Sequence, residues 1–322
     1  MITPITYPTA LNFWLRAKGP IDEFISYYDF AGNSGEYFLK DVHLYDLTAP
    51  LHVMVPNASS RHKGNDIVSH VIPKGLPKDS FVQLTNSLYI ITPECCFLMA
   101  AASLSVPELV VLANDLCAIY RLDPLSVTGQ SSRKPITDLN KLIKYVISAG
   151  KVRGLDKART ALKYAADNSN SPMESRLAAI FSLPLMYGGF GLPKPELNYN
   201  VNLSPGASAY MERDCCCCDM VWLRQRIAGE YDSNLAHLTP EQHYYDKKRT
   251  TALSLSGYKT VSITAKNLSS YSEIENLCVN MRRVLGLRAQ KDRLDKYSAI
   301  RRDTVNKIFF EKKKQVKPCF DK

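Results

Sequence analysis

Three acidic residues, Asp219, Glu230 and Asp232, lie in a segment whose sequence predicts two short strands joined by a turn. A two-residue turn at Arg224 and Gln225 sets a hairpin register in which Asp219 faces Glu230 and Asp232 lies on the same face. Carboxylates that face each other on a strand pair repel unless a cation lies between them, and Mg²⁺ or Mn²⁺ binds carboxylate oxygens. These three residues are therefore candidate metal ligands and catalytic groups. The alternative is a solvent-facing hairpin with scattered acids.

Two further candidates flank this segment. Upstream, Ser-Pro-Met-Glu from Ser171 opens a predicted amphipathic helix. Its Glu174 is either an acid that reaches the same site or the third helical residue of a capping box that begins at Ser171. Downstream, His237 is either a general base or phosphate ligand, or simply an exposed loop histidine.

A second predicted helix follows, with a capping box at Thr239 and proline at its first position, and it ends near Gly257. Gln242, Asp246 and Arg249 recur at i, i+4 and i+7, so they share a helix face that could close over the carboxylates. Arg249 would then supply a cation for phosphate. The alternative is a local salt bridge between Asp246 and Arg249.

The predicted order in this half of the chain is helix, strand, hairpin strand, helix, strand and helix, which is an α/β core. Its motifs follow one another in a specific order over residues 155 to 268: Ser-Pro-Met-Glu-Ser-Arg-Leu, Gly-Leu-Pro-Lys-Pro-Glu-Leu-Asn, Asp219 before a hairpin, Glu230-Tyr231-Asp232, His237-Leu-Thr-Pro-Glu-Gln, Asp246, Arg249 and Gly257-Tyr258-Lys259. Together they resemble the PD-(D/E)XK restriction-endonuclease-like superfamily. More narrowly, they are similar to its uncharacterised bacterial branch related to very-short-patch repair endonucleases.

This resemblance implies a restriction-endonuclease-like core, a mixed sheet flanked by helices, and Mg²⁺- or Mn²⁺-dependent hydrolysis of DNA phosphodiester bonds. It would make Asp219 the first metal carboxylate, Glu230 the second and Glu174 the acid that reaches the site from a helix. Asp232 stands where the superfamily's lysine is expected. The alternative is therefore a non-catalytic, antitoxin-like DNA-binding regulator on a nuclease fold.

The first 135 residues predict a smaller α/β domain, with strands near residues 51–55, 67–72 and 81–91 and helices that begin after Thr92 and at Pro107. Two of its segments, Leu-Thr-Ala-Pro-Leu-His-Val-Met-Val-Pro and Ile-Thr-Pro-Glu, resemble the front half of the same bacterial proteins, where a similar region is of the abortive-infection antitoxin class. The polar stretch 129–135, bounded by glycine and proline, predicts a linker. We therefore expect domains at 1–135 and 136–286, followed by a tail at 287–322.

The charge of the chain is uneven. There are 41 Lys and Arg against 31 Asp and Glu, and residues 288–322 hold 12 basic and 5 acidic side chains. The tail keeps helical periodicity, which predicts one or two basic amphipathic helices. These would dock on the body, bind nucleic-acid phosphates, or contact a protein partner or a second copy of the chain. An adaptor that uses this tail is a further, structural possibility.

The four consecutive cysteines, Cys215 to Cys218, suggest a metal site, but strand geometry argues against one. Neighbouring strand residues alternate between faces, so no more than two thiols converge, and zinc-finger spacing is missing. Adjacent thiols in a chain without a signal peptide or a long apolar run favour a reducing cytosol. We therefore expect a cytoplasmic protein that does not bind a membrane, and its 45% apolar content is enough for ordinary packed cores.

Overall fold

The computed structural model describes residues 4–19, 47, 49–62, 64–84, 88–232, 240–288 and 291–311, with the side chains of residues 240, 242, 243 and 291–293 left out. The chain divides into two compact units. Of the described residues, unit 1 comprises those up to Lys163 and unit 2 comprises those from Tyr164 on.

Unit 1 is built on a group of helices. They are α1 (Thr9–Arg16), α2 (Pro93–Ala100), α3 (Val106–Leu116), α4 (Leu139–Ser148) and α5 (Leu155–Leu162). Helix α2 begins at Thr92, whose side chain accepts a hydrogen bond from the backbone N–H of Cys95, and seven of its eight residues are buried. A helix that is apolar on every side belongs in the middle of a core, and α2 contacts α1, α3, α4 and α5.

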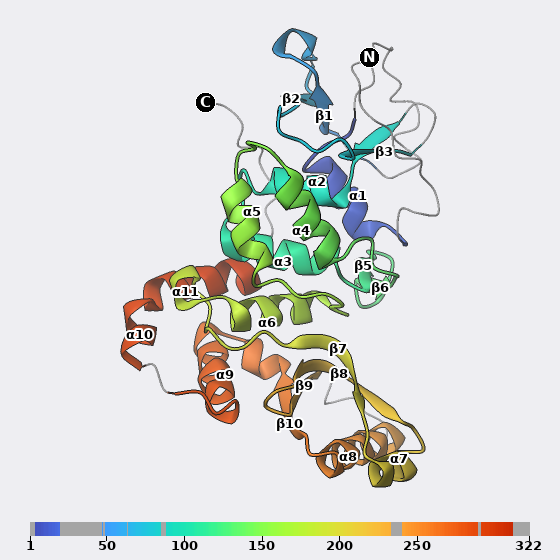
Figure 1. The fold of residues 1–322 in the computed structure, drawn as a ribbon, viewed down its shortest axis with the longest axis vertical. Helices are drawn as coiled ribbons and strands as arrows, with labels where there is room; N and C mark the ends of the chain where they lie inside the picture. The colour runs from blue at the N-terminus through green and yellow to red at the C-terminus, as the bar shows by residue number, and fades with distance from the viewer. Residues whose placement is uncertain are drawn as a thin grey trace. The chain divides into compact units, whose positions relative to one another are not determined.

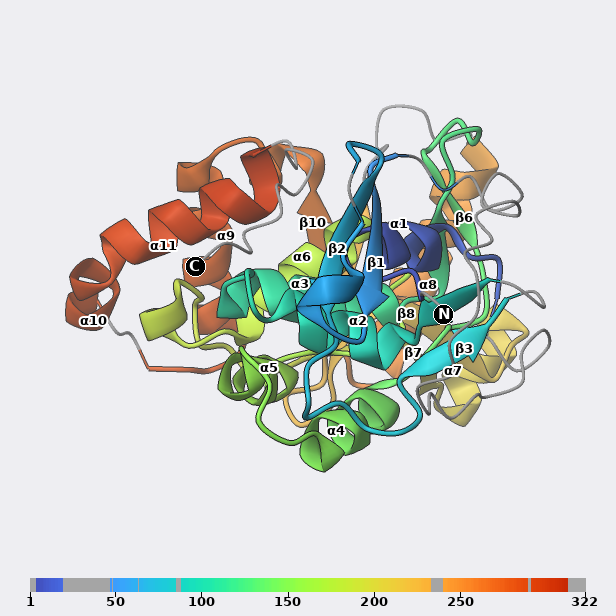
Figure 2. The same cartoon turned by 90° about the horizontal axis from the view of Figure 1, so that it is seen from above.

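Unit 1 also contains six short strands among its described residues. They are β1 (Leu51–Val55), β2 (Ile67–Val71), β3 (Phe81–Gln83), β4 (Tyr89–Ile91), β5 (Tyr120–Leu122) and β6 (Gln130–Ser132). Strands β1 and β2 pair in parallel and lie side by side in both views of the ribbon (Figures 1 and 2). Ile5 forms isolated bridges to Val53 of β1 and Ile90 of β4, so one buried residue joins two small sheets.

The segment predicted as a linker, residues 129–135, lies within unit 1 and does not separate two units. Its residues 130–132 form β6, which pairs with β5 in an antiparallel hairpin. The buried guanidinium of Arg133 donates to the carbonyl oxygens of Trp14 at 2.7 Å and Asp115 at 3.1 Å. Helices α4 and α5 then pack on α2 and α3, so the division between the units falls after Lys163 and not at residue 135.

Unit 2 contains a mixed four-stranded sheet. In spatial order its strands are β10 (Lys259–Thr264), β9 (Ile227–Asp232), β8 (Cys215–Trp222) and β7 (Glu196–Asn202). The pairs β7–β8 and β8–β9 are antiparallel, whereas β9–β10 is parallel. A parallel pair needs a crossover, and α8 (Pro240–Leu255) provides it. The chain is therefore α/β, as predicted.

Helices flank this sheet (Figure 1). They are α6 (Pro172–Ser182), α7 (Pro205–Met211), α8 and α9 (Tyr271–Val284), with single 3₁₀ turns at Leu185–Tyr187 and Ala265–Leu268. Helices α7 and α8 pack against each other, and a buried apolar cluster joins them to the sheet. Cys216 and Cys218 lie in that cluster while Cys215 and Cys217 are exposed, which confirms the predicted alternation.

The described part of the predicted basic tail packs within unit 2. Its elements are α10 (Lys291–Lys296), α11 (Ser298–Val305) and a π-helical turn at Asn306–Phe310. Arg301, which is 1% exposed, pairs with Glu275 of α9 at 2.7 Å and lies over the ring of Phe190 at 5.1 Å. Val305 and Ile308 are buried as well. Of the placements considered for the tail, docking on the body is the one that residues 291–311 adopt.

No helix in the described ranges combines the length and the apolar character needed to cross a membrane.

Candidate functional site

Glu174 lies at the start of α6 in the interior of unit 2. It is 5% exposed. Ser171 is the N-cap, and its hydroxyl accepts a hydrogen bond from the backbone N–H of Glu174 and donates to Glu174 Oε1 at 2.8 Å. The backbone N–H of Asn170 donates to Glu174 Oε2, also at 2.8 Å. The capping role is therefore real, but it does not account for the other contacts of this carboxylate.

Glu174 is also tied to the sheet. The side-chain amide of Asn198 in β7 donates to Glu174 Oε2 at 2.8 Å. Asn198 has a φ of 46°, a left-handed conformation that asparagine tolerates better than most residues, and the ladder between β7 and β8 skips it. Burial raises the pKa of Glu174 to about 7, and the negative charge of Asp219 adds to the rise. The structure thus couples Glu174 to the predicted site.

Asp219 lies in the middle of β8, where the pairing with β9 changes. The ladder pairs Met220 with Gly229 in the predicted register and continues from there to the turn. On the other side of that pair, the Asp219 carboxylate accepts a hydrogen bond from the backbone N–H of Tyr231 at 2.8 Å. Burial raises the pKa of Asp219, and the charge of Asp232 contributes to the rise. The Asp219 side chain takes the place of a backbone hydrogen bond between β8 and β9, so the regular pairing of these strands ends at the carboxylates.

Glu230 forms an ion pair with Arg249. The Arg249 guanidinium, which comes from α8, lies 2.7 Å from Glu230 Oε1, and both side chains are largely buried. The same guanidinium nitrogen donates to the carbonyl oxygen of Cys217. Burial raises the pKa of Glu230, and Arg249 offsets part of that rise. Arg249 therefore reaches the carboxylates as one predicted alternative required, and its ion pair is with Glu230 rather than with Asp246.

Asp232, at the end of β9, accepts a hydrogen bond from the hydroxyl of Ser262 in β10 at 2.6 Å. Its charge acts on Asp219, so it borders the same group of acids. His237 lies outside the described residues, and so does the side chain of Gln242. Asp246 is exposed on α8.

Sequence reasoning did not find Asn198 or Ser262. Asn198 is the last residue of the Gly-Leu-Pro-Lys-Pro-Glu-Leu-Asn motif, and an asparagine inside a predicted strand is a signal of unusual backbone geometry. Ser262 has no such signal, because a serine on an exposed strand face is ordinary.

Among the described residues, no group of three or more His, Cys, Asp or Glu side chains is arranged to hold a metal ion. The predicted three-carboxylate set is not formed in this arrangement, because Glu230 is held by Arg249 and Asp232 by Ser262. Mg²⁺ commonly takes one or two carboxylates and fills its other positions with water and phosphate oxygens. Glu174, Asp219 and Glu230 all have raised pKa values, so a cation would stabilise their charged forms.

Comparison with known proteins gives two partial matches. The chain is 31% identical over 116 residues to the uncharacterized proteins MT2308 and Rv2248 from two strains of Mycobacterium tuberculosis. The match covers 36% of this chain and 38% of each relative, so the chain matches well under half the length of either. No protein-family model matches the chain. No solved structure matches it either.

Proposed function

We propose that unit 2 hydrolyses phosphodiester bonds of nucleic acid, with DNA as the substrate, in a reaction that depends on Mg²⁺ or Mn²⁺. The observation that carries this proposal is the group of Glu174, Asp219 and Glu230. These three carboxylates come from α6, β8 and β9, and they are all buried enough to have raised pKa values. Asp219 and Glu230 interact with Arg249, and Glu174 interacts with Asp219. We refer to these four residues as the carboxylate–arginine group.

The arrangement of elements supports the same proposal. Helix α6 is followed by β7, β8 and β9 in antiparallel order, then by α8 as a crossover, and then by β10 parallel to β9. The sequence predicted this order for α6, β8, β9, α8 and β10, over which the chain resembles restriction-endonuclease-like proteins; β7 and α7 were not predicted. The acids in question lie on two neighbouring central strands and on the helix before them, so the sheet positions them.

In this proposal Asp219 and Glu230 hold the metal ion, with Glu174 and Asp232 beside them. The bound ion would lower the pKa of a water molecule and neutralise charge that develops on the phosphate. Glu174, whose pKa is about 7, can hold or release a proton near neutral pH, which suits a group that assists proton transfer. Arg249 already lies among the carboxylates, and its planar guanidinium is well shaped to bind a phosphate. It would provide the cation that Asp232 cannot.

A second candidate is a DNA-binding regulator that does not cleave. The specific observation in its favour is the ion pair between Arg249 and Glu230, which occupies one of the two metal carboxylates. A cation already present in the protein fills part of the role of a metal ion. Position 232, occupied by aspartate, is consistent with the same interpretation.

Metal titration and cleavage assays on the full chain separate the two candidates. Isothermal titration with Mn²⁺ should show one or two sites that disappear in Asp219→Ala and persist in Asp246→Ala, which removes an exposed acid of α8. Plasmid DNA should be nicked or cut slowly with Mg²⁺ or Mn²⁺, and Glu230→Ala should lower the rate by about a hundredfold or more. Arg249→Ala should lower the rate more than it lowers DNA affinity, because a cation needed in the transition state adds little to ground-state binding.

The contrary result is equally clear. If the purified protein binds DNA tightly but leaves plasmid, linear duplex and single strands intact with either metal, the nuclease proposal fails and the regulator takes its place.

A further inference from the structure

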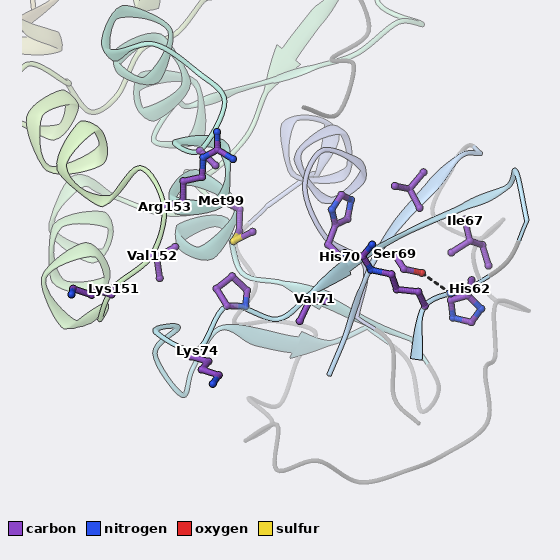
Figure 3. Close-up of a pocket in the computed structure, with 14 residues that line it drawn as sticks. His62, Ile67, Ser69, His70, Val71, Lys74, Met99, Lys151, Val152 and Arg153 are labelled. Atoms are coloured by element: carbon purple, nitrogen blue, oxygen red, sulfur yellow. Dashed lines mark hydrogen bonds between the residues drawn. The ribbon is translucent and has the colours of Figure 1, made fainter. Parts of the chain in front are cut away.

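A pocket in unit 1 lies apart in the sequence from the carboxylate–arginine group. Its lining comes from β2, from the end of α2 and from the turn between α4 and α5, and its volume is about 640 Å³. That volume is in the range of sites for small molecules. Figure 3 shows Ser69 and His70 of β2 on one side, and Val152 and Arg153 of the turn on the other, with Lys74 below Val152.

The charged side chains of this lining are all basic. They are Arg61, Lys74, Lys151 and Arg153, and no carboxylate of the described residues forms an ion pair with any of them. His70 lines the same pocket: burial lowers its pKa to about 4, and the positive charges of His52 and Arg61 lower it further. Cations that gather around a concave surface without a counter-ion produce a positive potential that attracts anions.

The backbone that carries two of these cations is fixed at both ends. The N–H of Gly150 donates to the carbonyl oxygen of Gly75 at 2.8 Å, and a Cβ on Gly75 would lie 2.9 Å from the backbone of Gly150. At the other end, Gly154 has a φ of +88°, and a Cβ there would lie 2.2 Å from the carbonyl oxygen of Ala101. Only glycine allows both close approaches. The turn between these contacts therefore presents its side chains from a defined position.

The pocket also has an apolar wall, formed by Ile67, Val68, Val71, Pro73, Met99 and Val152. A small inorganic anion would leave this wall in contact with water. A ligand that uses the whole lining carries several negative charges together with a ring or other apolar group. The pocket volume is too small for a folded partner but sufficient for such a molecule.

We propose that this pocket binds a free nucleoside polyphosphate. The phosphates contact Arg61, Lys74, Lys151 and Arg153, where Arg and Lys donate charge-assisted hydrogen bonds to phosphate oxygens. The nucleoside packs on the apolar wall. The proposal rests on unit 1 alone and is independent of the function proposed for unit 2.

Isothermal titration of the full chain with ATP tests this assignment. EDTA is present, so that a metal-dependent site in unit 2 does not contribute. The double variant Lys151→Glu/Arg153→Glu should lose at least about tenfold in ATP affinity, because it reverses two of the four pocket charges. Lys144→Glu is the matched control, because it reverses an exposed charge on α4 outside the pocket lining. The ATP affinity of this variant should stay within about twofold of that of the wild type. Lys74→Glu gives a second, separate test if the double variant does not fold, as judged by circular dichroism.

Two partial ligands complete the experiment. Inorganic tripolyphosphate should bind at least about tenfold more weakly than ATP, since it lacks the group that covers the apolar wall, and adenosine should bind more weakly still. Undetectable ATP binding would overturn the proposal, as would equal losses in the pocket variants and in Lys144→Glu. Tripolyphosphate that binds as tightly as ATP would overturn the nucleoside assignment. Asp219→Ala should bind ATP like the wild type, and loss of binding there would place the ligand in unit 2.

Discussion

Two helices of this protein begin with nearly the same sequence and have different surroundings. Helix α3 follows Ser105 with Val-Pro-Glu, and α6 follows Ser171 with Pro-Met-Glu. In α3 the carboxylate of Glu108 accepts a hydrogen bond from the backbone N–H of Ser105 at 2.8 Å, which completes a capping box. In α6 the carboxylate of Glu174 accepts instead from Asn170, Ser171 and Asn198 and interacts with the charge of Asp219.

The difference shows that a capping motif alone does not identify a functional acid. Both sequences begin a helix in the same way, because both place a serine oxygen and a glutamate near backbone N–H groups that have no partner within the helix. Only α6 begins against a sheet that carries other acids. The tertiary neighbours, and not the motif, bring Glu174 into the carboxylate–arginine group.

The largest expected difference is in catalysis. Glu174→Ala should lower the rate of DNA cleavage by about a hundredfold, the scale for losing a group that assists proton transfer. Glu108→Ala removes the same type of cap from α3 and should leave the rate per folded molecule unchanged. Initial rates of plasmid nicking with Mn²⁺ measure both. Equal cleavage rates for the two variants would show that Glu174 takes no part in catalysis and that α3 and α6 do not differ in this respect.

The next effect is on the pH dependence of stability. The folded pKa of Glu174 is raised to about 7, above its value in an unfolded chain, so the folded state binds the extra proton between these two values. Its contribution to stability is therefore complete below the unfolded pKa and is lost as pH rises through the folded pKa. From pH 5 to pH 8 the free energy of unfolding should fall by roughly 2 to 3 kcal/mol more in the wild type than in Glu174→Gln.

Urea unfolding of both proteins at the two pH values gives this difference. Glu108→Gln, measured in parallel, accounts for the general effect of removing a capping glutamate. The same pH dependence in wild type and Glu174→Gln would show that burial and Asp219 do not act on Glu174 as inferred.

The smallest effect concerns the two N-cap serines. Ser105→Ala should lower the free energy of unfolding by about 1 kcal/mol, the usual contribution of an N-cap. Ser171→Ala should cost about 1 kcal/mol more than that. Both hydroxyls donate to the glutamate three residues later, but the Glu174 carboxylate is buried whereas Glu108 is only half-buried. Thermal and urea unfolding of the two variants under identical conditions provide the comparison. A larger loss at Ser105 would reverse the expected order.

The sequence predicted local features well. The register of β8 and β9 has the predicted pairs Met220–Gly229, Val221–Ala228 and Trp222–Ile227, although the turn is four residues long rather than two. Helix α8 ends at Leu255, with Gly257 at a φ of +78°, as the glycine indicated. These features depend on residues a few positions apart, so their periodicity and turn chemistry are visible in the chain.

Errors arose where distant residues decide the outcome. The polar stretch 129–135 has the composition of a linker, but β5 provides a partner for its backbone and Trp14 provides an acceptor for Arg133. The sequence left open what the basic segment after residue 287 packs on, and the structure shows that its Arg301 contacts Phe190 and Glu275 of unit 2. The composition of a segment indicates how readily it is exposed to water. It does not show which distant residues will pack on it.

The candidate site also has residues that the sequence predicted and contacts that only the structure shows. Its acids were found from the sequence because carboxylates in predicted strands are costly and therefore conspicuous. The sequence by itself determined the hairpin, the alternation of the four cysteines and the helices that begin at Ser171 and Thr92. Only the tertiary structure decided that Arg249 pairs with Glu230, that Asn198 holds Glu174, and that four cations line one pocket of unit 1. The physical reason is that local order follows from neighbouring side chains, whereas charge pairing and burial depend on which distant segments come into contact.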